Sequence, residues 1–178
     1  RNVPDECTPG SDVAICSVLS YDPRKYCPGR GPLETPAKGI QLGKNDVAYR
    51  CNIITEANDA IADYSAGHIT TKEAEQLIAA IKTAFDKPGV EFYSGLDYRH
   101  FLILRDNPDA DKIKCIPPHD VTGTKVSKVM PKATVPGAQE TAKLLRKMIK
   151  KSRAILRNHP VNIARQKAGK RPGNLIWP

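Results

Sequence analysis

The sequence predicts an α+β domain in which a small mixed β-sheet packs against helices. Short apolar segments typical of strands lie between residues 46 and 116, and two amphipathic segments typical of helices follow them. A third helical pattern separates the first strand from the later ones. Strands and helices in this order are typical of α+β domains.

The N-terminal stretch TPGSDVAICSVLSYDP, residues 8–23, predicts a short helix that starts at Ser11. Serine is a favoured N-cap residue, and an aspartate in the first turn suits the helix dipole. The N–H groups at a helix start also stabilise a phosphate, so a serine there is a candidate phosphoryl acceptor. The spacing alone favours the capping role. Residues 22–46 are rich in proline and glycine, which predicts a turn-rich connection suited to a domain boundary.

The first predicted strand covers residues 46–55. One set of alternating side chains is apolar throughout, whereas the other carries Arg50 and Asn52 at its middle. An arginine in the middle of a strand needs an anion, which is either a carboxylate of the protein or one of a ligand. Arg99 and His100 pose the same question at the start of the predicted strand 98–105. For these residues the sequence is consistent with either a structural ion pair or a contact to a ligand.

Thr70 and Glu73 have the spacing of a capping box, and the apolar residues that follow them recur at helical spacing up to residue 85. Residues 90–95 and 98–105 predict two strands around a Gly-Leu-Asp turn, and residues 112–116 predict a further short strand. These segments give three or four strands and one helix before the C-terminal region.

The stretch IPPHDVTG places His119 and Asp120 behind two prolines at the end of a predicted strand. A His-Asp pair in such a loop can bind a substrate or transfer a proton. The alternative is an ordinary turn in which Asp120 bonds its own backbone and His119 faces water, and the residues by themselves favour it.

Two helices are predicted at the C-terminus. Residues 137–159 place their apolar residues along one side and most of their lysines and arginines on the other, and the helix ends at His159-Pro160. A shorter helix, residues 161–169, carries Arg165, which its pattern predicts as a solvated helix residue.

The net charge of +9 is unevenly distributed, since residues 121–178 hold 14 lysines and arginines against the single acid Glu140. Such a segment fits a nucleic acid, an anionic small molecule, an acidic partner or simply a solvated face. Nucleic acid is disfavoured because Trp177 is the only aromatic residue of this segment and no binding motif is present.

Five scattered cysteines without CxxC spacing predict neither a disulfide framework nor a zinc site, and a reducing cytoplasm suits them. No apolar run is long enough to span a bilayer. The start Arg1-Asn2-Val3-Pro4 resembles neither a signal peptide nor the beginning of a gene product, so we expect an excerpt of a longer chain.

Several phrases occur together, in order, over nearly the whole chain, and their combination resembles the archaeal-type 2,3-bisphosphoglycerate-independent phosphoglycerate mutases. The phrases are PGSDVAICSVLSYDP, GRGPLE, DVAYRCNIIT, YRHFLILR, CIPPHDVTG, NHPVNIAR and GNLIWP. The resemblance implies an enzyme of the alkaline phosphatase superfamily that interconverts 3-phosphoglycerate and 2-phosphoglycerate in glycolysis and gluconeogenesis, through a phosphoserine and with two divalent metals, Mn or Mg and possibly Zn.

The resemblance implies that residues 1–39 are a strip of the metal-binding domain with a linker, and that residues 40–178 are an inserted domain that closes over the substrate. Ser11 matches the nucleophile, which contacts a metal in the full enzyme. The other metal ligands are expected outside this chain, so the excerpt alone is expected to hold no metal and to be inactive. The substrate-binding candidates on the matching phrases are Arg50, Arg99, His100, His119, Asp120 and Arg165.

Two alternatives remain. A related phosphotransferase of the same superfamily, such as a homoserine kinase-like enzyme, keeps the chemistry and changes the substrate. A nucleic-acid or partner-binding module uses the basic C-terminal segment instead, and it predicts a steep dependence of binding on salt. The implied partners of the mutase are the small-molecule phosphoglycerate and the remainder of its catalytic domain, with neither nucleic acid nor membrane.

Overall fold

The computed structural model describes residues 4, 7, 10–27, 29–85 and 87–178. The chain divides into two compact units, residues 1–41 and residues 42–178, which are described one by one below. The expected boundary between residues 39 and 40 lies close to this division. That the second unit is an inserted domain stays a prediction.

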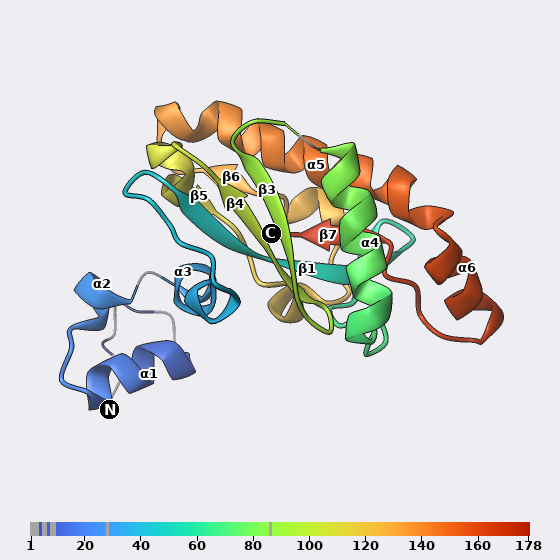
Figure 1. Ribbon diagram of the computed structural model, residues 1–178, viewed down its shortest axis with the longest axis horizontal. Helices are drawn as coiled ribbons and strands as arrows, with labels where there is room; N and C mark the ends of the chain where they lie inside the picture. The colour runs from blue at the N-terminus through green and yellow to red at the C-terminus, as the bar shows by residue number, and fades with distance from the viewer. Residues whose placement is uncertain (1–3, 5–6, 8–9, 28, 86) are drawn as a thin grey trace. The chain divides into compact units, whose positions relative to one another are not determined.

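The described residues of the first unit form short helices (Figure 1). They are α1 (Ser11–Val18), α2 (Pro23–Tyr26), α3 (Arg30–Glu34) and the 3-10 helix η1 (Pro36–Lys38). Gly10, rather than Ser11, is the N-cap of α1: its backbone is extended and its carbonyl accepts the helical hydrogen bond of Ala14 at 2.9 Å. The predicted cap is therefore wrong by one residue, since Ser11 is the first helical residue.

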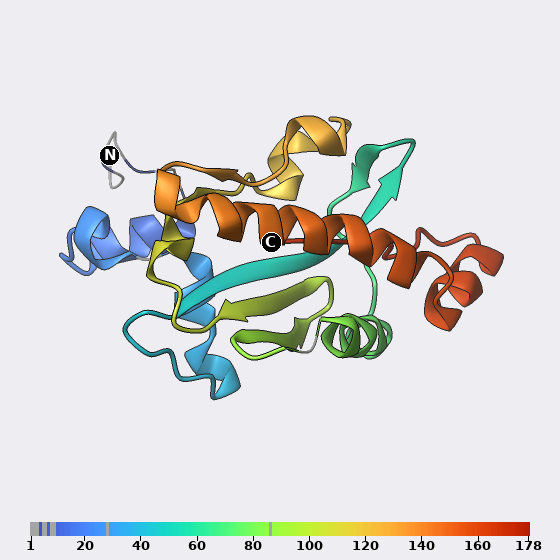
Figure 2. The same ribbon diagram turned by 90° about the horizontal axis from the view of Figure 1, so that it is seen from above.

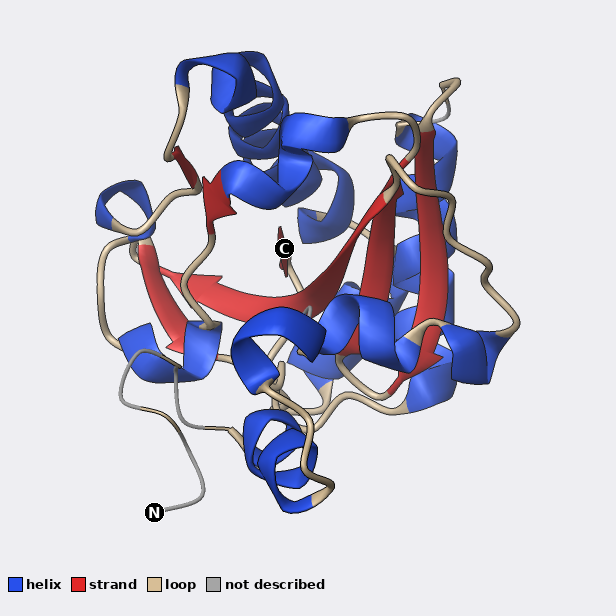
Figure 3. Ribbon diagram, turned by 90° about the vertical axis from the view of Figure 1, so that its left-hand side faces the viewer, coloured by secondary structure: helices blue, strands red, loops and turns tan. Residues whose placement is uncertain are grey.

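The second unit is built on a five-stranded sheet. Its strands are β1 (Val47–Ala57), β2 (Ala60–Asp63), β3 (Val90–Leu96), β4 (Arg99–Leu104) and β7 (Leu175–Trp177). The order is β2-β1-β4-β3, and β7 also pairs with β1. Figure 3 shows β1 curving across the unit, with β2 at one end and the β3–β4 hairpin at the other. The α+β class is confirmed, and each pairing in this sheet is antiparallel.

Helices α4 (Thr71–Ala84) and α5 (Gln139–Arg157) pack on one face of this sheet, and helix α6 (Pro160–Lys167) packs against α4 and α5. Figure 2 shows α5 running along β1, with α4 beyond the β3–β4 hairpin. Apolar side chains of β1, β3 and β4 meet those of α4 and α5 in the main core. In the described part of the chain, no helix has the length and apolar character needed to cross a membrane.

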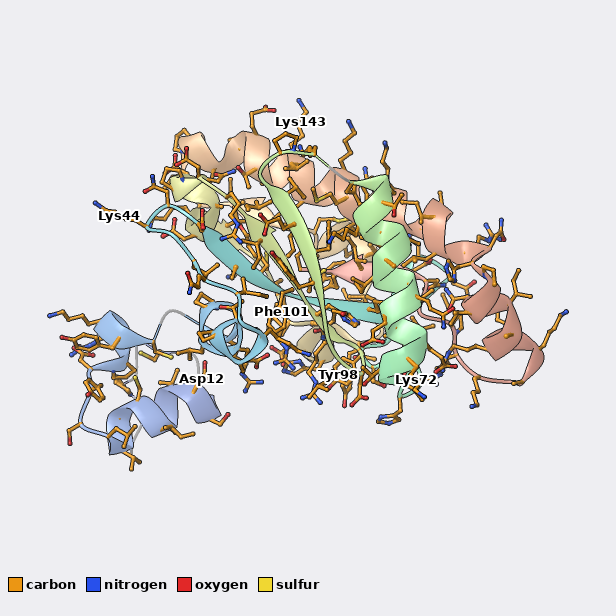
Figure 4. All side chains as sticks on the ribbon, in the orientation of Figure 1. Asp12, Lys44, Lys72, Tyr98, Phe101 and Lys143 are labelled. Carbon is orange, nitrogen blue, oxygen red and sulfur yellow. The ribbon has the colours of Figure 1, made fainter. Side chains whose placement is uncertain are left out.

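The capping box predicted for α4 is present. Thr70 Oγ1 accepts a hydrogen bond from Glu73 N–H, and Thr70 N–H donates to the Glu73 carboxylate at 3.0 Å. The buried residues of this helix, Ala74, Leu77, Ile78 and Ile81, belong to the predicted apolar set; of the other two predicted members, Ala84 is exposed and Phe85 is the partly buried C-cap. Helix α5 likewise buries its predicted apolar side and exposes most of its lysines, including Lys143 (Figure 4).

Shorter elements connect the strands and helices. They are the 3-10 helices η2 (Pro108–Lys112), η3 (Pro118–Val121), η4 (Val126–Lys128) and η5 (Pro136–Ala138), and the two-stranded ribbon of β5 (Ile113–Lys114) with β6 (Lys132–Ala133). The strand predicted over 112–116 is thus only two residues long and lies outside the main sheet. Its ladder with β6 consists of the pairs Ile113–Ala133 and Lys114–Lys132, and it ends at Lys114, before Cys115 and Ile116.

Candidate functional site

The sheet face turned away from the helices carries the polar residues predicted for strand β1. Cys51 and Ile53 join the core beneath the helices, so Arg50 and Asn52 point to the opposite face. Register places Arg50 opposite Phe101 and Asn52 opposite Arg99 of β4. Opposite residues of an antiparallel pair project to the same side. Arg50, Asn52, Arg99 and Phe101 therefore share one face, and we call these four residues the arginine face.

The β3–β4 hairpin fixes the position of Arg99. Asp97 adopts a positive φ of 54° in the turn, and the carbonyl of Tyr98 accepts a hydrogen bond from Ile53 N–H at 2.8 Å. Gly95 is required beside the turn because a Cβ there would collide with the backbone of Arg99. The Arg99 guanidinium lies 5.0 Å from the centre of the Tyr98 ring, within cation–π range. Figure 4 labels Tyr98 and Phe101 on this hairpin.

His100 does not join the arginine face. It is fully buried, stands opposite Cys51 on the helix side of the sheet, and its Nδ1 accepts a hydrogen bond from Gly95 N–H at 3.1 Å. The alternation of a strand requires this separation from Arg99. The structure thus gives His100 a position that supports the hairpin and keeps it apart from the other candidates.

His119 and Asp120 lie in the 3-10 helix η3. Their side chains are each 55% exposed, and 3.3 Å separates His119 Nε2 from Asp120 Oδ1. The His119 ring packs edge-on against Tyr64, with 6.0 Å between ring centres, and Tyr64 packs edge-on against Tyr98 at 5.8 Å. A row of three rings, His119, Tyr64 and Tyr98, therefore ends at the ring against which the Arg99 guanidinium lies.

The contacts of Arg165 are with other groups of the protein, which indicates a structural role. It is 3% exposed, so the solvated position predicted for it is wrong. Its Nε donates to the carbonyl of Arg171, its Nη1 to Glu73 and its Nη2 to the carbonyl of Ala66. These partners all lie within the protein, and they draw the guanidinium inward from helix α6.

Ser11 lies in the first unit, at the start of α1, and is exposed. The neighbouring Asp12 is half-buried: one carboxylate oxygen lies 3.8 Å from Arg30 Nε, and the other accepts from the Cys27 thiol at 3.7 Å. Burial, with a smaller contribution from Asp12, raises the pKa of the Cys27 thiol. The thiol is therefore held in its neutral form beside this helix start.

A metal centre requires ligands beyond these groups. Among the residues with described positions, no three His, Cys, Asp or Glu side chains gather where they could hold a metal ion. A dinuclear site of divalent metals needs several such ligands. The described residues do not form one.

Comparison with known proteins shows the family of this chain. The profile of the family described as "2,3-bisphosphoglycerate-independent phosphoglycerate mutase" matches residues 1–162. Proteins of that name from Methanosarcina mazei and Methanosarcina barkeri are 42% and 44% identical to it over 177 residues. The chain belongs to the 2,3-bisphosphoglycerate-independent phosphoglycerate mutase family. It spans 43% of the length of these two relatives and 99% of its own.

Solved structures agree with this membership. The "Cofactor-Independent Phosphoglycerate Mutase from Thermoplasma acidophilum" has a TM-score of 0.73 and 34% identity, and the match covers 96% of this chain and 46% of that one. The PH0037 protein from Pyrococcus horikoshii, at 22% identity and a TM-score of 0.68, shares the fold; that match covers 96% of this chain and 36% of that one. The resemblance read from seven short phrases is confirmed.

The ring row was missed at the sequence level in this mutase-family chain. Tyr64 follows strand β2, which was not predicted, although Asn58 and Asp59 are residue types that tolerate the positive φ of a hairpin turn. Both residues have positive φ, 52° and 60°, as the two central positions of a tight hairpin turn require. Tyr98 directly precedes Arg99 in the sequence. Its connection to His119 depends on Tyr64, which is distant from both residues in the sequence.

Proposed function

We propose that the complete protein interconverts 3-phosphoglycerate and 2-phosphoglycerate through a phosphoserine at Ser11. Membership of the mutase family supports this activity, and the chain supplies part of the machinery. The two divalent metals of the proposed enzyme, Mn or Mg with Zn as the alternative, would be held by residues outside those described. When bound, they would supply Lewis-acid activation of the serine hydroxyl.

The arginine face is the observation that carries the proposal. Arg50 and Arg99 project from neighbouring strands to the same side of the sheet, and phosphoglycerate carries both a carboxylate and a phosphate. Guanidinium groups bind both anions through paired N–H donors in a fixed plane. Two such groups on adjacent strands suit a small ligand with an anion at each end.

Ser11 suits the role of phosphoryl acceptor. It is exposed at the first position of α1, where backbone N–H groups that lack helical partners stabilise a phosphate. A phosphoserine intermediate must be kept from water before the phosphoryl group moves to the second hydroxyl. His119 with Asp120 is proposed to bind the glycerate hydroxyls or to carry their protons.

The proposed enzyme acts in the cytoplasm. The five cysteines of the chain form no disulfide, which suits a reducing compartment. Its proposed partners are phosphoglycerate and the remainder of its own catalytic domain, with residues 40–178 as the inserted domain.

The test is the steady-state conversion of 3-phosphoglycerate by the complete protein with Arg50→Ala and Arg99→Ala. Each variant is expected to lower kcat/KM at least about 100-fold, since it removes a charged hydrogen-bond donor from a bound anion. Arg50→Lys and Arg99→Lys should recover part of that loss, because they retain the charge without the planar fork. Lys143→Ala, on the outer side of α5, is the matched control and should leave kcat/KM unchanged. Wild-type kinetics in both arginine-to-alanine variants would refute the role of the arginine face, and a complete wild-type protein that does not convert 3-phosphoglycerate would refute the proposed activity.

A further inference from the structure

Asn52 contains a buried acceptor that the protein does not use. The residue is 6% exposed, and its Oδ1 has no hydrogen-bond partner in the described part of the chain. Buried side-chain polar atoms are nearly always paired, because an unpaired one loses its water without compensation. Such an atom in a folded protein therefore needs an explanation.

A structural role does not account for Asn52, as a second buried asparagine shows. Asn162 is fully buried, its Nδ2 donates to the carbonyls of Leu156 and Gly173 at 2.8 Å, and its Oδ1 accepts from Gly173 N–H at 2.8 Å. This amide joins two segments of backbone. The Oδ1 of Asn52 accepts no hydrogen bond from the described residues.

An unpaired donor lies beside this acceptor. Asn52 stands between Arg99 of β4 and Trp177 of β7, which are its partners in register. Arg99 Nε is also buried without a hydrogen-bond partner among the described residues. The two atoms belong to directly opposed residues on one face, yet they do not bond each other. A buried donor and a buried acceptor on neighbouring strands suit a ligand that carries a hydroxyl next to an anionic group.

We propose that Asn52 binds the free hydroxyl of phosphoglycerate, with Oδ1 as the acceptor, while Arg99 Nε donates to an oxygen of the same molecule. This inference rests on the proposed function and adds to it a residue that distinguishes hydroxylated substrates. A site built to bond a hydroxyl rejects an analogue that lacks it, because the analogue leaves the buried acceptor unpaired.

The test is calorimetric binding of two ligands to the complete protein. One is 3-phosphoglycerate, and the other is 3-phosphonooxypropanoate, which has the same carboxylate and phosphate but no hydroxyl. Wild type should bind the first at least about tenfold more tightly. Asn52→Leu, which has no acceptor, should bind the two ligands within about twofold of each other. Asn45→Leu alters an exposed loop asparagine and should retain the wild-type preference.

A second measurement does not depend on the ligand. Leucine at position 52 removes the unpaired oxygen, so Asn52→Leu should have a midpoint of thermal unfolding at or above that of wild type. A structural asparagine would behave in the opposite way, and Asn162→Leu should show it by unfolding at a clearly lower temperature. A lowered midpoint for Asn52→Leu would count against the inference.

Failure of the inference and failure of the proposed function give different results. If wild type converts 3-phosphoglycerate but binds both ligands equally, or if Asn52→Leu retains the preference, the role of Asn52 is overturned and the mutase activity stands. If wild type neither converts nor binds 3-phosphoglycerate, the proposed function falls and the hydroxyl assignment falls with it.

Discussion

Arg165 and Glu73 form an ion pair between helices α6 and α4, with 2.7 Å between Nη1 and Oε2. Arg165 is 3% exposed in its side chain, and its remaining nitrogens donate to backbone carbonyls. The guanidinium thus connects two helices and the loop after β2 at one point. Such a group is expected to matter for stability, because its removal leaves several buried acceptors unpaired.

Arg165→Ala should lower the free energy of unfolding by about 3–5 kcal/mol, the usual loss when one partner of a buried pair is removed. Arg171→Ala is the matched control. Arg171 also pairs with a carboxylate, that of Asp63 at 3.0 Å, but its side chain is 61% exposed. A surface pair of that kind contributes about 0–1 kcal/mol. Urea unfolding of the chain measures both, and equal losses in the two variants would contradict the structural role of Arg165.

Tyr64 should influence turnover through His119. Their rings pack edge-on, and such a pair contributes about 0.5–1.5 kcal/mol beyond the area it buries. We expect Tyr64→Ala to lower kcat/KM of the complete protein for 3-phosphoglycerate about two- to tenfold, and Tyr64→Phe to retain it because the ring remains. In a His119→Ala background, Tyr64→Ala should have no further effect. Additive losses in the double variant would show that Tyr64 acts elsewhere.

Asp46 should make the chain sensitive to acid. Its carboxylate accepts from Arg105 at 2.7 Å and from the N–H groups of Asp106 and Gly43, and these bonds lower its pKa to about 2. A lowered folded pKa stabilises the fold above the unfolded value near 3.8, and this stability is lost as the pH falls toward 2. Asp46→Asn should therefore reduce the loss of stability between pH 4 and pH 2.

The control for this prediction is Asp106→Asn, which alters an exposed aspartate that accepts a hydrogen bond only from Asn45 among the described residues. Chemical unfolding at a series of pH values gives the slope for each variant. If Asp46→Asn and wild type lose stability in parallel below pH 4, the Arg105 contact is not the cause.

His159 should make the stability of α6 depend on pH in a range closer to neutral than the range of Asp46. Its Nδ1 caps the helix by accepting from Val161 N–H at 3.3 Å, and burial lowers its pKa. The neutral ring is the capping form, so the stabilisation is complete above the unfolded pKa near 6.5 and is lost as the pH falls through the folded pKa. His159→Asn supplies a capping oxygen that does not titrate. Its free energy of unfolding should vary less between pH 7 and pH 5 than that of wild type; an unchanged slope would contradict the capping role.

Local sequence patterns predicted the parts of the structure that depend on local spacing. The two-residue period of β1 placed Arg50 and Asn52 on one face, and the Thr70-Glu73 spacing predicted the start of α4. The same two-residue period separates Arg99 from His100, so the opposed positions of these two candidates were available from the sequence.

Local sequence patterns could not predict contacts between segments that are distant in the sequence. Arg165 was predicted as solvated because two of its partners, the Glu73 carboxylate and the carbonyl of Ala66, lie far earlier in the chain. Strands β2 and β7 have only four and three residues, too few for a period to show. The aromatic row of Tyr98, Tyr64 and His119 depends on three separate segments, and no spacing along the chain indicates it.

The central claim is that Ser11 carries the phosphoryl group during catalysis. The direct measurement is mass spectrometry of the complete protein, quenched in acid during turnover of 3-phosphoglycerate and digested. We expect one phosphoryl group on the peptide that contains Ser11, and none on that peptide in Ser11→Ala, which should also lack mutase activity. Mutase turnover without phosphate on Ser11, or full activity in Ser11→Ala, would contradict it.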